Sequence, residues 1–275
     1  MNDIREGALQ HSEAIEILRW WKDAGVDFAI DDTTKYRFEQ QHETLKSEST
    51  GVNITAKYAP DRLEPVASPR LAPNLSVPVA SNALAAAAVN LESLREVMEA
   101  FEGCALKRTA TQLVFADGVP GSSVMLVGEA PGGEEDRIGR PFVGRAGQLL
   151  DRMLASIGLD RSSVYVANIV PWRPPGNRTP TPQEVQTCLP FIRRQIQLSA
   201  PKVLVCLGGS AAQSLFGIKE GITRLRGRWY SYEDGNGRTL PALAMLHPAY
   251  LLRQPSHKRY AWLDLRALAH ALKGD

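Results

Sequence analysis

The sequence predicts an α/β fold whose central sheet is mostly parallel and covered by helices on both faces. Four short apolar runs, at residues 122–127, 163–170, 202–208 and 239–246, are each followed by a helical pattern. Continuous apolar strands that alternate with amphipathic helices are typical of parallel sheets buried on both sides. The first run leads into a glycine-rich loop, residues 128–144. Such a loop exposes backbone amides at the carboxyl edge of an open α/β sheet, where ligands bind.

The chain divides into three predicted regions. Residues 1–30 contain a short acidic helix, which we interpret as an accessory element. Residues 31–89 are rich in Pro, Ser, Ala and Thr without a sustained hydrophobic period, which predicts a flexible linker. Residues 90–275 form the folded domain, which opens with a helix over 90–101 capped by Asn90.

The remaining helices of the domain follow the apolar runs in order. The first run is followed by a helix over residues 146–158 and the second by one over 181–199. We expect that second helix to break before Pro190, so that its start is a separate turn. A short helix follows the third run, and a last helix covers about residues 258–272.

Composition excludes several classes of protein. The chain has 275 residues, of which 44% are hydrophobic, and no apolar run approaches the ~18 residues of a membrane span. No secretory signal is recognisable, so we expect a cytoplasmic protein. Three cysteines are too few for a disulfide framework. Residues 1–100 carry 10 basic and 16 acidic side chains and residues 101–275 carry 22 and 14, so the second part is suited to a polyanion.

The glycine-rich loop has an ordinary explanation and a functional one. Its glycines are compatible with simple tight turns and its acids with a solvated rim. It lacks both the GK[ST] ending of a phosphate-binding loop and the G-x-G-x-x-G spacing of dinucleotide folds, so we predict no nucleotide cofactor.

Polar residues follow each of the four predicted strands, and the fold brings these strand ends to one crevice. Taken singly, Asn168 suits a structural hydrogen bond, His247 a structural histidine and Phe142 the core. Their convergence with the glycine-rich loop favours a functional site.

The motifs GEAPGGEEDRIGRPFVGRAGQLLD, YVANIVPWRPPGNRTPTPQE, PKVLVCLGGSAA, LRGRW and HPAYLLRQPSHK together resemble the family 4 uracil-DNA glycosylases. The resemblance covers roughly residue 91 to the C-terminus, and it is closest to a proteobacterial branch of that family. It implies a three-layer α/β/α sandwich around a mostly parallel four-stranded sheet. It also implies an enzyme of base excision repair that flips uracil out of DNA and hydrolyses its N-glycosidic bond.

The resemblance assigns roles to the candidate residues. Phe142 would stack on the flipped base, and Asn168 would pair with the edge of uracil and mismatch that of cytosine. His247 and the backbone amides near Glu129 and Ala130 would hold the 2-carbonyl oxygen. Glu129 would orient water or stabilise the sugar cation. The expected catalytic residues are Glu129, Asn168 and His247, and the expected substrate-binding residues are Gly128, Ala130, Glu135, Phe142 and Asn168, with Glu135 excluding thymine.

A second group of residues is expected to hold the DNA. Leu251 or Leu252 would enter the minor groove as a wedge, and the basic residues around them would contact phosphates. A merely solvated face is the alternative for each basic residue. The expected DNA contacts are Arg173, Asn177, Arg178, Leu251, Leu252, Arg253, His257, Lys258 and Arg259.

The chain departs from the family at an iron–sulfur site. The resemblance implies four cysteine ligands, of which Cys104 and Cys188 are present, whereas Phe101 and Trp172 occupy the other two positions. Because neither aromatic side chain ligates iron, we predict no cluster, no other metal and a hydrophobic plug in its place. A related group that traps uracil-containing DNA uses a histidine in a basic insertion, and the WRPPGNRTP loop has neither the insertion nor the histidine, which favours turnover.

We therefore expect a cofactor-free, monomeric uracil-DNA glycosylase whose partner is uracil-containing DNA, without a membrane association. Two alternatives remain open at this point: a glycosylase with wider base tolerance, and a uracil-DNA binding module without turnover. A nucleotide-binding α/β protein is disfavoured by the missing phosphate-loop lysine.

Overall fold

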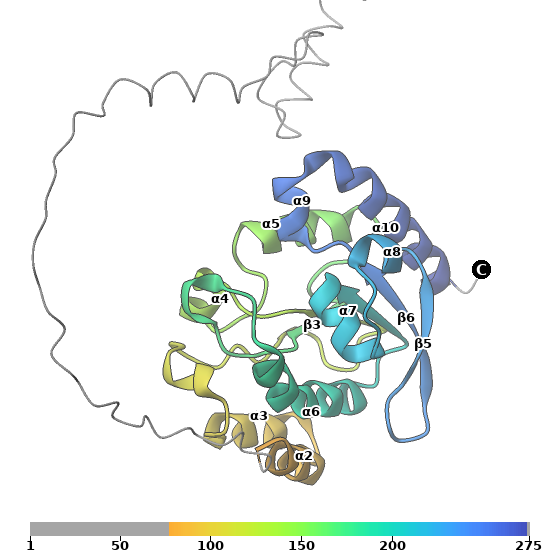
Figure 1. The fold of residues 1–275 in the computed structure, drawn as a ribbon. Coiled ribbons are helices and arrows are strands. Elements are labelled where there is room, and N and C mark those ends of the chain that lie inside the picture. Colours follow the sequence, from red (N-terminus) through yellow and green to blue (C-terminus); the bar gives the residue numbers. More distant parts are fainter. Residues whose placement is uncertain (1–76, 274–275) are drawn as a thin grey trace, which may run out of the picture. The chain divides into compact units, whose positions relative to one another are not determined.

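The computed structural model describes residues 77–273, which form one sheet with helices on both faces (Figure 1). The strand order is β1-β3-β2-β4-β6-β5. The inner strands are β2 (Val124–Gly128), β3 (Val164–Asn168), β4 (Val203–Leu207) and β6 (Thr239–Met245). All of their pairings are parallel. The parallel four-stranded core predicted from the apolar runs is confirmed.

The described sheet has two more strands than predicted, one at each edge. β1 (Asp117–Gly118) pairs antiparallel with β3, and β5 (Trp229–Glu233) pairs antiparallel with β6. β1 is too short to leave a hydrophobic period, and within β5 only Tyr232 is buried. Neither strand therefore carries the continuous apolar signal of the inner four.

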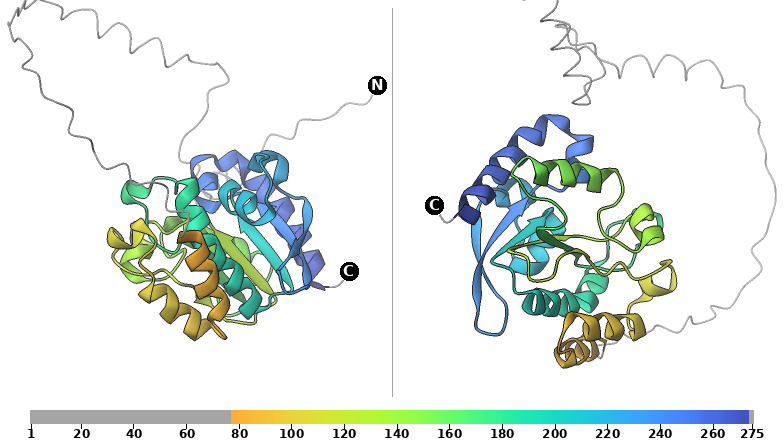
Figure 2. Two further views of the ribbon diagram at one scale, coloured as in Figure 1. Left: turned by 60° about the horizontal axis from the view of Figure 1, so that its bottom comes forward. Right: turned by 180° about the vertical axis from the view of Figure 1, so that it is seen from behind.

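The helices form two layers that enclose the sheet, as Figure 2 shows from two sides. One layer contains α2 (Val77–Ala87), α3 (Leu91–Ala100), α6 (Pro182–Ser199) and α7 (Gly209–Phe216). The other contains α5 (Arg145–Ala155), α9 (Pro248–Arg253) and α10 (Lys258–Lys273). Shorter elements are η1 (Ala105–Arg108), α4 (Gly133–Ile138), η2 (Pro175–Asn177), α8 (Ile222–Leu225) and η3 (Pro255–His257). None of the helices between residues 77 and 273 has the length and apolar content to cross a bilayer.

Each inner strand supplies side chains to both cores in alternation. On β2, Met125 and Val127 belong to the core under α6, whereas Val124 and Leu126 belong to the core under α5 and α10. All five residues of β2 are buried. The period of two along a strand thus explains why a strand covered on both faces is apolar throughout.

Two predicted boundaries need correction. The predicted linker extends to residue 89, but residues 77–87 form α2, in which Ser81 and Ala85 are buried. Its alanine-rich sequence has high helix propensity, and Arg194 of α6 donates a 2.8 Å hydrogen bond to the carbonyl of Ala88. The helix predicted in residues 1–30 and residues 31–76 of the predicted linker lie outside the described residues.

The expected break before Pro190 is absent, since α6 continues through this residue. A proline inside a helix removes one hydrogen bond and usually kinks or ends it. Here Phe191, Ile192 and Ile196 are all buried against the sheet, and this packing keeps the helix in one piece.

A buried ion pair joins the LRGRW segment to α10. Arg226 donates from Nε to Oδ2 of Asp264 at 2.9 Å and also bonds Oδ1 of that carboxylate and the carbonyl of Tyr260. The Asp264 side chain is 1% exposed. Burial raises the pKa of Asp264, and the Arg226 guanidinium opposes that rise. The ion pair with Arg226 therefore offsets the free-energy cost of burying the Asp264 carboxylate.

We predict that Arg226→Met lowers the free energy of unfolding by about 3–5 kcal/mol, because it leaves the buried Asp264 carboxylate without its partner. Urea denaturation measures this change. Arg228→Met is the matched control, since Arg228 is 65% exposed and lies 3.9 Å from Glu220; its effect should stay within about 0.5 kcal/mol. Equal effects of the two substitutions would contradict the prediction.

Candidate active site

The carboxyl ends of the inner strands surround one cavity of about 580 Å³. β2 leads to Glu129, β3 ends at Asn168, β4 leads to Gly208 and β6 leads to His247, and all four residues line the cavity. After β3 the chain crosses β2 to form β4, so the strand order reverses beside β2. Ligands of open α/β sheets bind at this kind of switch point.

Gly128 allows a close approach of two side chains of the site. It is paired with Asn168 in the register of β2 and β3. A methyl group at Gly128 would lie 2.5 Å from Oδ1 of Asn168 and 2.6 Å from Cζ of Phe142. The absence of a side chain is therefore what lets the amide and the aromatic ring approach each other.

Phe142 has the left-handed backbone conformation, with φ of 55°, which is strained for a bulky residue. The residue is 5% exposed, and its ring stacks on that of His247 with a centroid distance of 5.4 Å. Gly147 makes this conformation possible, because a methyl group there would lie 1.6 Å from the Phe142 carbonyl oxygen. The aromatic ring is thus held as a wall of the cavity.

Asn168 presents a buried amide to the cavity. Its side chain is 5% exposed, and its Oδ1 has no hydrogen-bond partner within residues 77–273. A buried carbonyl oxygen without a partner costs free energy, so the site is suited to a ligand that brings an N–H donor.

Burial shifts the pKa values of both Glu129 and His247. Burial raises the pKa of the Glu129 carboxyl, whose Oε1 is buried and lacks a partner among the described residues. Burial, assisted by the charge of Arg253, lowers the pKa of His247 to about 4, with Glu135 opposing the shift. His247 is therefore neutral at physiological pH.

The capping bond of α9 selects the tautomer of His247. Nδ1 accepts a 3.1 Å hydrogen bond from the backbone N–H of Ala249. An accepting Nδ1 carries no proton, so the proton of the neutral ring is on Nε2. The ring thereby offers an N–H donor from Nε2.

Glu135 has a structural task in addition to lining the cavity. Its Oε1 accepts hydrogen bonds from the backbone N–H groups of Val143 (3.0 Å) and Gly144 (2.9 Å), and its Oε2 accepts one from Gly132 at 3.1 Å. The carboxylate thus joins the start of the glycine-rich loop to its end.

The residues expected to hold DNA fall into two places. Asn177, Arg178 and Arg253 line the cavity. Outside the cavity lining, His257 ends η3, and Lys258 and Arg259 begin α10. Arg178 forms a bidentate ion pair with Glu184, in which Nη2 donates to Oε1 at 2.7 Å and Nη1 donates to Oε2 at 2.9 Å. Arg173 donates to Oδ1 of Asn177 at 2.7 Å. 

The wedge assignment needs correction for one of its two residues. Leu251 is 1% exposed and packs in the core with α5 and α10, so it is not accessible to DNA. Leu252 is only partly buried and remains available. A helix as short as α9 is too short for a hydrophobic period in the sequence to show which of the two leucines is buried.

The positions implied as cluster ligands do not fit a four-cysteine cluster. The sulfur atoms of Cys104 and Cys188 lie 3.8 Å apart. Phe101 and Trp172 are buried, their ring centroids lie 6.4 Å apart, and Phe101 also meets Phe191 edge to face at 5.0 Å. No group of three or more His, Cys, Asp or Glu residues suited to a metal occurs in the described part of the chain.

Sequence reasoning missed Arg161, whose guanidinium bonds the backbone carbonyls of Pro141 and Phe142. It lies in the turn before β3, within the segment DRSS, and no motif marks it there.

Comparison with known proteins assigns this fold and site to a family. The model of the uracil DNA glycosylase superfamily matches residues 115–266, and the chain belongs to this superfamily. The chain is 43% identical to a Type-4 uracil-DNA glycosylase of Archaeoglobus fulgidus over 166 residues, which is 59% of this chain and 82% of that protein. It is 40% identical over 169 residues to the Type-4 uracil-DNA glycosylase of Thermotoga maritima, covering 61% of this chain and 86% of that protein. The family resemblance read from the motifs is confirmed.

We predict that Gly128→Ala lowers the single-turnover rate on uracil-containing DNA by about 100-fold, because the added methyl group displaces Asn168 and Phe142. The melting temperature, recorded on the same sample, separates this loss from unfolding. Gly221→Ala is the control, since a methyl group there has no heavy atom within 4 Å. Full activity of Gly128→Ala would show that the close approach is not required.

Proposed function

We propose that this chain excises uracil from DNA by hydrolysis of its N-glycosidic bond, with Glu129, Asn168 and His247 as its catalytic residues. The observation that carries the proposal is the buried Asn168 amide, whose Oδ1 has no partner among the described residues. Asn168 lines the same cavity as Phe142. Membership of the uracil DNA glycosylase superfamily supports it.

The cavity is suited to a base that has left the double helix. Extrusion of a base costs a few kcal/mol, which contacts in the pocket must offset. Phe142 offers a fixed aromatic wall on which the base stacks. Oδ1 of Asn168 accepts the N3–H of uracil, and the amide NH₂ donates to the 4-carbonyl oxygen. Cytosine has an amino group at that carbon and no hydrogen on N3, so it mismatches both groups.

His247 is proposed to stabilise the leaving group. When the bond between C1′ and N1 breaks, the electron pair goes to uracil, and negative charge develops on its 2-carbonyl oxygen. The neutral imidazole donates its Nε2–H to that oxygen, and the backbone amides near Glu129 and Ala130 add further donors. A donor that is already oriented needs no rearrangement during the reaction.

Glu129 is proposed to act on the other side of the breaking bond. Its carboxylate stabilises the oxocarbenium-like sugar or orients the water whose oxygen bonds to C1′. In the second case the proton of that water passes to Glu129. Both tasks require the ionised carboxylate, whose pKa is raised by burial.

Glu135 is proposed to exclude thymine. Three backbone N–H groups hold its carboxylate in one position at the cavity wall. A side chain fixed in this way cannot move aside for the 5-methyl group, so it provides a steric barrier.

DNA is proposed to bind across the mouth of the cavity. Leu252 enters the space of the flipped base, and Arg253 together with the basic start of α10 contacts phosphates. We further propose a cytoplasmic monomer, because the substrate is DNA and a single chain supplies the complete set of Glu129, Asn168 and His247 around the cavity.

The protein is proposed to work without an iron–sulfur cluster. Phe101, Trp172 and Phe191 fill the region with packed aromatic rings. Such packing supports the RPPGNR loop through buried apolar area rather than through metal ligation. The proposed reaction needs no redox step.

We predict that the rate of uracil release falls tenfold per pH unit on the acid side, below a pKa that lies above the ordinary Glu value of 4.5. Lowering the pH protonates Glu129 before His247, whose pKa is about 4. Glu129→Gln should lower the single-turnover rate by about 100-fold and abolish the acid limb.

The control for this experiment is Glu134→Gln, since Glu134 is exposed and pairs with Arg137 on the surface. An acid limb that persists in Glu129→Gln would assign the titration to another group. DNA binding without release of uracil by the unaltered protein would contradict the glycosylase proposal and indicate a recognition module.

We also predict that the purified protein binds no stoichiometric iron and that a chelator leaves its unfolding free energy unchanged. Trp172→Ala should lower that free energy by about 3–5 kcal/mol, because it empties a buried aromatic site. Trp262→Ala is the matched control, since Trp262 is 46% exposed, and it should change stability by about 0.5 kcal/mol or less. Iron in a fixed ratio to protein would contradict the cluster-free proposal.

A further inference from the structure

The strained backbone of Phe142 requires something to hold it. With φ of 55° and a bulky side chain, this residue would relax to an ordinary conformation in a free loop. Strain of this kind persists only where surrounding groups overdetermine the conformation.

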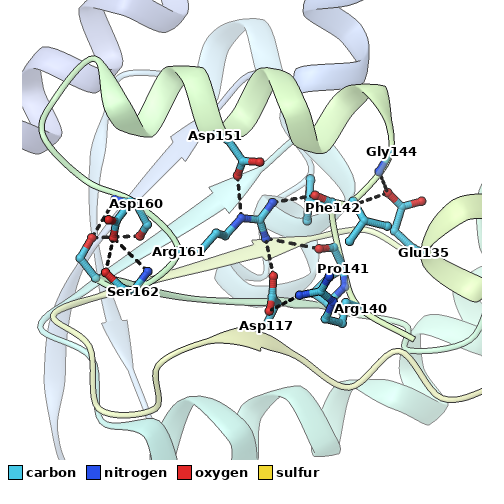
Figure 3. A network of polar contacts seen from close by, with 12 residues as sticks. Asp117, Glu135, Arg140, Pro141, Phe142, Gly144, Asp151, Asp160, Arg161 and Ser162 are labelled. Carbon is cyan, nitrogen blue, oxygen red and sulfur yellow. Dashed lines mark hydrogen bonds and ion pairs between the residues drawn. The ribbon is translucent and has the colours of Figure 1, made fainter. Parts of the chain in front are cut away.

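Arg161 holds the carbonyl side of the loop, as Figure 3 shows. Its Nη2 donates to the carbonyl of Phe142 at 2.6 Å, and its Nη1 donates to that of Pro141 at 3.3 Å. Its Nη1 also bonds Asp117 of β1 at 3.2 Å, and its Nε bonds Asp151 of α5 at 2.6 Å. The two carboxylates fix the guanidinium between two elements that flank the loop.

Glu135 holds the amide side of the same loop. It accepts the N–H groups of Val143 and Gly144, the two residues after Phe142. The peptide group between Phe142 and Val143 is therefore bonded to Arg161 through its carbonyl and to Glu135 through its N–H, two side chains of opposite charge. Such charge-assisted bonds are stronger than neutral ones.

The geometry explains why this residue is an arginine. All three of its nitrogens donate, to partners on three different segments of the chain. A planar guanidinium can do so in one orientation, whereas a lysine ammonium is a single point of charge. The side chain is 25% exposed, so water screens these bonds only in part.

We propose that Arg161 is a positioning residue for base recognition, which acts by holding the ring of Phe142 where the base stacks. The inference rests on the proposed stacking role of Phe142. Arg161 does not line the cavity and contacts its wall through the backbone of Pro141 and Phe142.

A double-substitution cycle tests the proposal. Arg161→Gln and Arg161→Lys are each made in the full chain and in the Phe142→Ala variant. Single-turnover rate and inhibition by free uracil report on stacking, while active-site titration and melting temperature report on folding. Arg161→Gln should lower the rate and weaken uracil inhibition, each by about tenfold, as expected for the loss of one aromatic stacking contact.

Two further results are expected if Arg161 acts through Phe142. Arg161→Lys should not restore the rate, because lysine keeps the positive charge but lacks the planar guanidinium that donates to several partners at once. In the Phe142→Ala background, Arg161→Gln should cause no additional loss of rate, since the effects of substituting two coupled residues are not additive. Arg152→Gln removes an equal charge from an exposed position of α5 and should leave the single-turnover rate and the inhibition by free uracil unchanged.

Three outcomes would overturn the proposal, and they are distinguishable. A full additional loss in the Phe142→Ala background would show that Arg161 acts elsewhere. A reduced active fraction with normal rate and normal uracil inhibition per active molecule would show a role in folding alone. If Phe142→Ala itself has no effect, the stacking role of Phe142 fails, and the role of Arg161 fails with it.

Discussion

The parallel register of β2 and β3 is the constraint on which the rest of the site depends. It sets Gly128 beside Asn168, and the missing side chain of Gly128 leaves the space that the Asn168 amide and the Phe142 ring occupy. Every other group is placed with respect to this contact. The ring of His247 stacks on Phe142, and the charged side chains that hold the loop act on the backbone around it. A shift of one residue in that register would turn Asn168 to the opposite face of the sheet.

A single physical cause, removal from water, prepares both ionisable groups of the site. It raises the pKa of Glu129 and lowers that of His247, because burial disfavours the charged form of each. The consequences differ. His247 is left as a neutral donor over the whole physiological range, whereas the ionised form of Glu129 finds little solvation and gains from a cationic neighbour. Such a site favours a reaction in which positive charge develops on the sugar and negative charge on the base.

Aromatic packing surrounds the positions that the family resemblance assigns to cluster ligands. In this chain the RPPGNR loop is adjacent to three aromatic rings and two closely spaced thiols. Dispersion and hydrophobic burial are not directional. The loop also has directional ionic contacts, such as that between Arg178 and Glu184. Stability and catalysis are thereby supported by separate parts of the domain: the aromatic cluster on one face of the sheet, and the loop around Phe142 at its carboxyl edge.

The sequence by itself determined the four inner strands, most helices of the domain, the family and the candidate residues Glu129, Asn168 and His247, because these depend on local hydrophobic period and short motifs. It did not reveal α2 as part of the domain, the continuity of α6 through Pro190, or the two edge strands, since each is stabilised by contacts with distant segments. Only the tertiary structure decided that Leu251 is buried and that Arg161 holds Phe142. Arg161 joins residues 10 to 44 positions away along the chain, and no periodicity records which distant carbonyls and carboxylates a side chain will meet once the sheet has formed.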